Sequence, residues 1–122
     1  MSYVLIVDDD PTMAQAIADM VGIFDWKTQV VHGPRQALQA IQKVPPALIL
    51  LDLNMPGVDG FEVCRYIKRD PLAAKTPVVF VTAEDAPSMQ EKAREAGASD
   101  YLIKPVDIDR LEGILDKLPK AK

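Results

Sequence analysis

Five short runs of apolar residues recur along this chain, and a segment with helical periodicity follows each of them. The runs are YVLIV at 3–7, QVV at 29–31, ALILL at 47–51, PVVFV at 77–81 and DYLI at 100–103. Runs that are apolar on both faces are typical of strands covered on both sides, as in a parallel sheet. We therefore expect five strands buried between two layers.

The segments between the runs each carry one apolar stripe, which is expected to face the sheet. The stripes are Met13, Ile17, Met20 and Val21; Ala37, Leu38 and Ile41; Phe61, Cys64 and Ile67; Met89, Ala93 and Ala96; and Leu111, Ile114, Leu115 and Leu118. Five strands that alternate with five helices, joined by connections too short for anything but crossovers, predict an α/β fold with a doubly wound sheet. Residues 1–122 are expected to form one domain.

The ends of several predicted helices are marked by residues with a known local preference. Asp10 stands immediately before Pro11, which predicts an N-cap aspartate followed by a proline at the first helical position. Asp107 is the expected N-cap of the last helix, and Gly97 fits a helix C-terminus.

The composition restricts the classes of partner. The 122 residues are 48% hydrophobic and 26% charged, which predicts a folded domain rather than a disordered chain. A net charge of −4 without a basic run disfavours nucleic acid as a partner. The single cysteine, Cys64, excludes an internal disulfide bond, and the chain shows neither a basic leader nor a long apolar stretch. We expect a cytoplasmic location and no membrane contact.

Polar side chains lie at the ends of four predicted strands. They are Asp8 and Asp9, Asp52, Thr82 and Lys104. Since the carboxyl ends of parallel strands meet at one edge of the sheet, where ligands bind in such folds, we expect these side chains to gather into one site.

Three aspartates at this edge require a cation. Like charges about 4 Å apart repel each other by roughly 4 kcal/mol at an effective dielectric near 20. Lys104 is one candidate for the cation, and Mg²⁺ is another, because it prefers a few carboxylates, water and phosphoryl oxygens. A metal, an amine, a hydroxyl and a carboxylate nucleophile are also the groups that phosphoryl transfer uses.

Four motifs in register extend this interpretation. VDDD follows the first strand, LDLNMPGVDG surrounds Asp52, VTAED covers 81–85 and YLIKP covers 101–105. Together they make the chain similar to the receiver domains of two-component response regulators, in particular to the stand-alone chemotaxis type. The resemblance implies a flavodoxin-like fold with the strand order 2-1-3-4-5.

The resemblance also implies a role for each residue of the site. Asp52 would accept a phosphoryl group from a sensor histidine kinase or a histidine phosphotransfer protein. Thr82, Ala83 and Lys104 would bind that group, and Thr82 with Tyr101 would form the switch. Mg²⁺ would be held by Asp8, Asp9, Asp52 and the backbone carbonyl of Asn54. The bond before Pro105 would be cis, and a protein partner would read the fourth helix, fifth strand and fifth helix.

Alternative functions remain open at this stage. A haloacid-dehalogenase-like phosphatase also forms an aspartyl phosphate, but it needs an acid two residues after the nucleophile, where this chain has Asn54. A flavodoxin-type flavin site needs hydrogen-bond donors after the first strand, where this chain has three aspartates. A pseudo-receiver that only binds partners would usually lack one of the site residues. We expect no enzyme activity beyond self-phosphorylation and self-dephosphorylation.

Overall fold

The computed structural model describes residues 2–84 and 87–119 as five strands and five helices that alternate along the chain. The strands are β1 (Tyr3–Val7), β2 (Lys27–Val31), β3 (Leu48–Asp52), β4 (Val78–Thr82) and β5 (Asp100–Ile103). The helices are α1 (Pro11–Ile23), α2 (Pro34–Lys43), α3 (Gly60–Arg69), α4 (Pro87–Glu95) and α5 (Ile108–Asp116).

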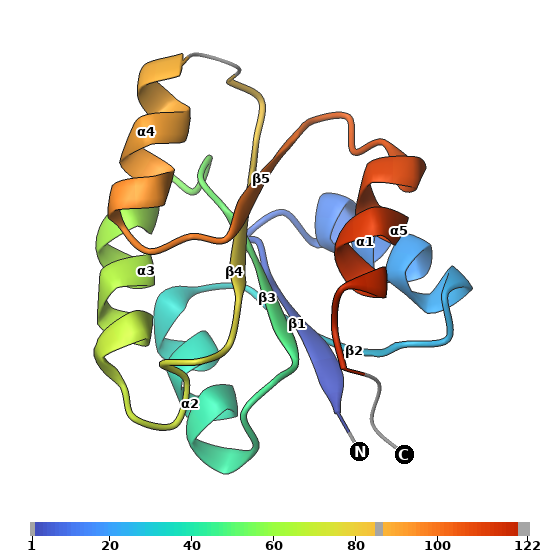
Figure 1. Cartoon of the computed structure of the whole chain (residues 1–122), viewed down its shortest axis with the longest axis horizontal. Helices are drawn as coiled ribbons and strands as arrows, with labels where there is room; N and C mark the ends of the chain where they lie inside the picture. The colour runs from blue at the N-terminus through green and yellow to red at the C-terminus, as the bar shows by residue number, and fades with distance from the viewer. Residues whose placement is uncertain (1, 85–86, 120–122) are drawn as a thin grey trace.

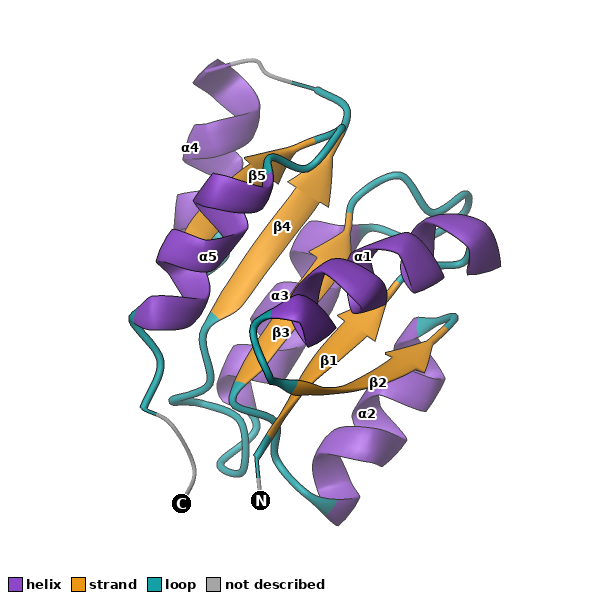
Figure 2. Cartoon of the chain, turned by 90° about the vertical axis from the view of Figure 1, so that its right-hand side faces the viewer, coloured by secondary structure: helices purple, strands orange, loops and turns teal. Residues whose placement is uncertain are grey.

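The strands form one parallel sheet in the order β2-β1-β3-β4-β5, as predicted. In Figure 2 the five arrows lie side by side and point the same way, so that their carboxyl ends line one edge. The chain order reverses its direction of growth at β1, because β2 lies on one side of this strand and β3 on the other. Such a reversal is where ligands bind in doubly wound sheets.

Helices cover both faces of the sheet. In Figure 1, α2, α3 and α4 lie on one side and α1 and α5 on the other. Alternate residues of β1 point into two separate cores: Leu5 and Val7 pack on the first side, and Val4 and Ile6 on the second. This arrangement explains why the central strands are apolar throughout, since both of their faces are buried.

The strand boundaries differ from the predicted runs in a regular way. β3 and β4 begin and end one residue later than expected, so Asp52 and Thr82 are the last residues of their strands. Pro77 precedes β4 because it has no N–H to donate; its carbonyl accepts a hydrogen bond from Ile49 N at 3.0 Å. β2 begins two residues earlier than its apolar run, at Lys27 and Thr28, because an edge strand tolerates polar side chains.

The predicted helix caps are confirmed. The side chain of Asp10 accepts hydrogen bonds from the N–H groups of Thr12 and Met13, and Asp107 accepts one from Asp109 N. Gly97 follows α4 with a φ of +99°, a conformation that favours glycine. α4 itself buries little: among its described residues only Ala93 is buried.

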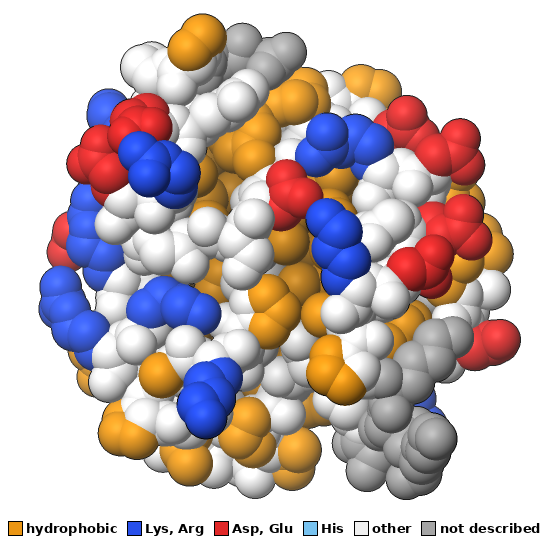
Figure 3. Space-filling model, in the orientation of Figure 1, with side chains coloured by type: hydrophobic (Ala, Val, Ile, Leu, Met, Phe, Trp, Pro, Cys, Tyr) orange, Lys and Arg blue, Asp and Glu red, His pale blue; other side chains and the backbone are white. Residues whose placement is uncertain are grey.

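The surface shows no single charged face in the view of Figure 3. Acidic side chains gather over α5, whereas Lys and Arg side chains lie over the region of α2, α3 and α4, interspersed with acidic ones. Within the described residues, no helix has the length and apolar character needed to cross a membrane.

Candidate functional site

The predicted side chains meet at the carboxyl edge of the sheet. One carboxylate oxygen from each of Asp8, Asp9 and Asp52 lies within 4.8 Å of the other two. Lys104, just past β5, reaches across to Asp52 with Nζ 3.0 Å from Oδ1. β1 and β3, which carry the three aspartates, are neighbours in the sheet, whereas β4 separates β3 from β5. The four residues span positions 8–104 of the sequence.

Asp8 is the most constrained carboxylate. Its residue is 1% exposed, and its Oδ1 accepts a hydrogen bond from Asp10 N at 2.9 Å. Its Oδ2 is buried and has no hydrogen-bond partner among the described residues. Burial raises the pKa of Asp8 to about 6, and the nearby charge of Asp52 adds to the increase, whereas the Asp10 N–H and Lys104 oppose it.

The negative charge of Asp52 is stabilised by more donors than that of Asp8. It is 3% exposed, and its Oδ1 accepts hydrogen bonds from Lys104 Nζ and from Asn54 N, both at 3.0 Å. The ion pair is largely withdrawn from water, because the side chains of Lys104 and Asp52 are 17% and 4% exposed. With Oδ1 engaged by two donors, Oδ2 is the oxygen left for chemistry.

The acidic group suits a divalent cation. Three carboxylates share one lysine, and no donor from the described part of the chain reaches the buried Oδ2 of Asp8. Such an orphaned acceptor is costly unless a ligand satisfies it. Mg²⁺ takes few protein oxygens and keeps several waters, which fits a cluster in which Asp9 is exposed. The residues present therefore fit a magnesium ion.

The loop after β4 is tied to the loop after β3. The side-chain oxygen of Asn54 accepts a hydrogen bond from Ala83 N at 3.1 Å, and Thr82 Oγ1 accepts one from Glu84 N at 3.1 Å. The sequence predicted only the carbonyl of Asn54 as functional and assigned no switch contact to Glu84. The Asn54–Ala83 contact has no signature in the sequence, because it depends on how two loops meet. The Thr82–Glu84 contact is local, of the kind in which a threonine hydroxyl bonds the backbone two residues on.

Tyr101 lies inside the molecule. It is 9% exposed, packs in the core beneath α4, and donates a hydrogen bond from its hydroxyl to the carbonyl of Glu84. The carbonyl of Glu84 thus accepts a hydrogen bond from the Tyr101 hydroxyl, while the N–H of Glu84 donates one to Thr82 Oγ1. The peptide bond between Lys104 and Pro105 is cis, in agreement with the sequence-based expectation.

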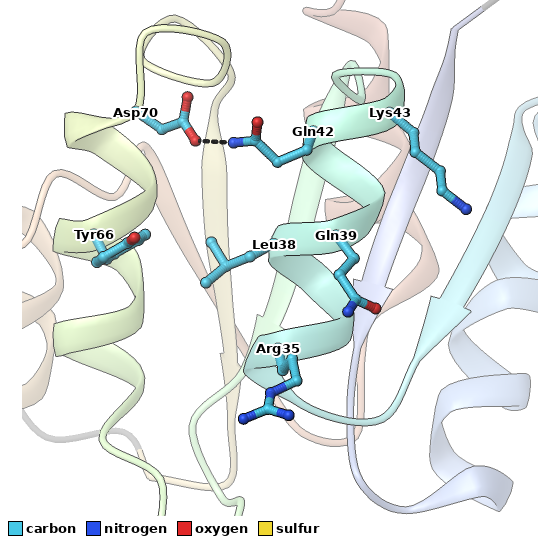
Figure 4. A pocket seen from close by; sticks show the side chains of 7 residues that line it. All are labelled: Arg35, Leu38, Gln39, Gln42, Lys43, Tyr66 and Asp70. Carbon is cyan, nitrogen blue, oxygen red and sulfur yellow. Dashed lines mark hydrogen bonds between the residues drawn. The ribbon is translucent and has the colours of Figure 1, made fainter.

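Two other features lie apart from this site. A groove of about 980 Å³ between α2 and α3 is closed in part by a 2.6 Å hydrogen bond from Gln42 to Asp70 and contains none of the predicted site residues (Figure 4).

Cys64 is fully buried, its thiol faces the Ala96 carbonyl, and burial raises its pKa to about 11. A thiol held protonated in this way is a poor nucleophile, so Cys64 has a packing role.

Comparison with known proteins decides the family. The protein-family model named response regulator receiver domain matches residues 4–116 of this chain. The chain belongs to this family. The match spans both the acidic pair after β1 and the lysine after β5, so the receiver domain includes the whole of the site described above.

Relatives of the receiver domain occur in several kinds of protein. The transcriptional regulator RpaA of Synechocystis sp. is 38% identical, with 99% of this chain and 53% of that protein aligned. The signal transduction histidine-protein kinase BarA of Escherichia coli is 35% identical, with 92% of this chain and 12% of that protein aligned. The chain spans at most about half the length of these relatives.

A solved structure resembles the chain over its full length. The chemotaxis protein CheY4 of Vibrio cholerae superposes with a TM-score of 0.89 at 27% identity, covering 98% of this chain and 99% of the other. The predicted flavodoxin-like receiver fold is therefore confirmed.

Proposed function

We propose that this receiver domain is a switch that is activated by phosphorylation of Asp52. The observation that carries the proposal is the position of this carboxylate: it is buried at the end of β3, 3.0 Å from Lys104 Nζ and within 4.8 Å of two other aspartates. Such a carboxylate is a nucleophile at a position where Lys104, together with a bound metal ion, would neutralise the charge of an incoming phosphoryl group.

The transfer would proceed by attack of an Asp52 oxygen on the phosphorus of a phosphohistidine. The new oxygen–phosphorus bond forms as the bond from phosphorus to the imidazole nitrogen breaks, and the imidazole of the donor protein leaves. Lys104 would then move its ion pair from the carboxylate to the phosphoryl oxygens, and the Thr82 hydroxyl and Ala83 N–H would donate to them. Ala83 N must first release Asn54 Oδ1, to which it is bonded at 3.1 Å.

The metal-binding residues would be Asp8, Asp9, Asp52 and the carbonyl of Asn54. When bound there, Mg²⁺ would supply positive charge that stabilises both the clustered carboxylates and the transferring phosphoryl oxygens. The orphaned Oδ2 of Asp8 supports this assignment.

The phosphoryl donor would be a sensor histidine kinase or a histidine phosphotransfer protein in the cytoplasm. A downstream protein partner would bind the face made by α4, β5 and α5, where a depression of about 480 Å³ reaches from Gln90 past Tyr101 to Pro105 and Arg110. This surface borders both Lys104 and Tyr101, so it is placed to sense changes at the site. We propose neither nucleic acid nor membrane as a partner of this chain.

Two alternatives are less well supported. A phosphatase of the haloacid-dehalogenase type needs a carboxylic acid two residues after the nucleophile, and Asn54 cannot shuttle a proton. A pseudo-receiver that works without phosphorylation has no need for the complete set of Asp52, Thr82 and Lys104. We therefore propose no enzyme activity on outside substrates, only gain and loss of the phosphoryl group.

The proposal is tested by direct phosphorylation. We expect the domain, incubated with a small-molecule phosphodonor and Mg²⁺, to gain the mass of one phosphoryl group, which base and hydroxylamine should remove. Asp52→Asn should abolish the gain, and Asp70→Asn, a matched control on the opposite edge of the sheet, should leave it intact. Labelling of Asp52→Asn at the wild-type level, measured by intact mass, would contradict the proposal.

The switch would use residue 84 as its link, because Glu84 contacts both Thr82 and Tyr101. Reorientation of the Thr82 hydroxyl toward a phosphoryl oxygen would disturb its bond to Glu84 N and, through the same residue, the contact with Tyr101. α4 is held by little buried area, so it can respond at low cost. A partner that binds one arrangement of α4 better than the other would then shift the population toward that arrangement.

We expect a phosphoryl mimic such as beryllofluoride with Mg²⁺ to shift amide resonances across residues 87–103 of the wild type. In Thr82→Ala the shifts should stay near Asp52, although this variant should still accept phosphate. Tyr101→Phe removes one hydroxyl and should reduce the response of α4 without changing phosphorylation, whereas Tyr66→Phe, at an exposed position of α3, should change neither. Wild-type shifts that never reach residues 87–103 would refute the switch.

A further inference from the structure

His32 lies beside the acidic pocket, although nothing in the sequence assigned it a role there. Its ring Nδ1 is 3.0 Å from the backbone carbonyl oxygen of Asp8. The residue that precedes it, Val31 at the end of β2, accepts a hydrogen bond from Asp8 N at 3.1 Å. The end of β2 therefore holds the backbone of Asp8 on both its N–H and its carbonyl.

His32 is itself fixed from α2. Its backbone N–H donates to the side-chain oxygen of Gln36 at 2.8 Å, within the first turn of that helix. A chain of contacts thus runs from Gln36 on α2 through His32 to the carbonyl of Asp8. Since a carbonyl oxygen only accepts hydrogen bonds, the geometry requires that Nδ1 carry the proton.

These contacts fix the orientation of the Asp8 carboxylate. Its Oδ1 is held by Asp10 N and its backbone by Val31 and His32, which leaves Oδ2 as the oxygen without a hydrogen-bond partner among the described residues. A carboxylate that is fixed in this way need not be ordered when a cation binds. Groups that orient a metal ligand without touching the metal raise affinity for it.

We propose that His32 is a positioning residue for the cation site, acting through an Nδ1–H hydrogen bond to the carbonyl of Asp8. This inference rests on the proposed function, because it concerns the same acidic pocket. It adds a residue from β2–α2 to a site otherwise built from the loops after β1, β3, β4 and β5.

The first experiment is a Mg²⁺ titration of purified domain, followed by amide resonances and by calorimetry. His32→Ala should raise the Kd for Mg²⁺ by about three- to ten-fold, the loss expected for one hydrogen bond of this kind. Its Tm without Mg²⁺ should stay within about 2 °C of the wild type, because the side chain is exposed. His32→Asn, whose amide nitrogen can donate from nearly the same position, should restore most of the affinity. Gln39→Ala, an exposed change on α2, is the control.

The second experiment reads the ring itself. His32 is the only histidine of the chain, so a long-range ¹H–¹⁵N spectrum contains a single imidazole. Near pH 8 we expect a protonated Nδ1 and a bare Nε2, with or without metal.

The outcomes separate the two proposals. If the wild type binds no Mg²⁺, the metal assignment of the proposed function fails, and the ring spectrum still tests the His32 contact. If the wild type binds Mg²⁺ and His32→Ala binds it equally well, the positioning role is wrong. A bare Nδ1 would overturn the contact, and a His32→Asn variant as weak as His32→Ala would overturn the donor role.

Discussion

Replacing Lys104 by methionine is expected to lower the free energy of unfolding by about 2–4 kcal/mol near neutral pH in the absence of Mg²⁺. The substitution keeps most of the apolar stem and removes the only described cation paired with Asp52, whose side chain is 4% exposed. The remaining carboxylate would be buried beside Asp8 without a paired cation, with the Asn54 N–H as its one remaining described donor. Urea unfolding measured by fluorescence or circular dichroism gives the difference directly.

A double-mutant cycle shows whether the loss comes from the ion pair. In Lys104→Met combined with Asp52→Asn, neither charge remains, so we expect the double variant to be more stable than Lys104→Met alone. Lys75→Met, at an exposed lysine, should change the free energy by no more than about 0.5 kcal/mol. Additive losses in the cycle would mean that the ion pair contributes nothing specific. Mg²⁺ should restore part of the stability of Lys104→Met, because it supplies the missing charge.

Most of the fold could be predicted from the sequence because burial on both faces leaves continuous apolar runs. β5 was predicted at its observed bounds, and β1 likewise, since each run is bounded by polar or turn residues. The start of β2 was misplaced because Lys27 and Thr28 lie on an edge strand, where polar side chains are allowed and the apolar criterion fails.

For the site, the sequence predicts which residues take part but not the contacts that orient them. The positions of Asp8, Asp52 and Lys104 follow from a topological rule, because parallel strands deliver their carboxyl ends to one edge. The contacts of Asn54 with Ala83 and of His32 with Asp8 depend on loop conformations and on the depth to which side chains are buried. No spacing or periodicity encodes them, so the sequence could name the participants of the site but not the bonds that orient them.

Replacing Asp8 by asparagine is expected to make the metal-free domain more stable near pH 8, by about 1–3 kcal/mol. Burial and the charge of Asp52 raise the pKa of Asp8 in the folded state to about 6, from an ordinary value of 3.8. Between these two values the folded chain binds more protons than the unfolded chain, so stability falls as the pH rises through this window. Above about pH 7 the full cost of the buried charge is present, and asparagine removes it.

The same variant should therefore lose its advantage as the pH is lowered. Near pH 4, where Asp8 is protonated in the folded wild type, the two proteins should unfold at similar temperatures. Asp9→Asn is the matched control: its side chain is exposed, so it should change the metal-free Tm little at any pH, although both variants should respond more weakly to Mg²⁺. Thermal unfolding of the three proteins from about pH 4 to 8, with and without Mg²⁺, separates a carboxylate that is held ionised at a cost from one that only binds the cation. An Asp8→Asn variant no more stable than the wild type near pH 8 would show that the buried charge is compensated by groups other than a metal.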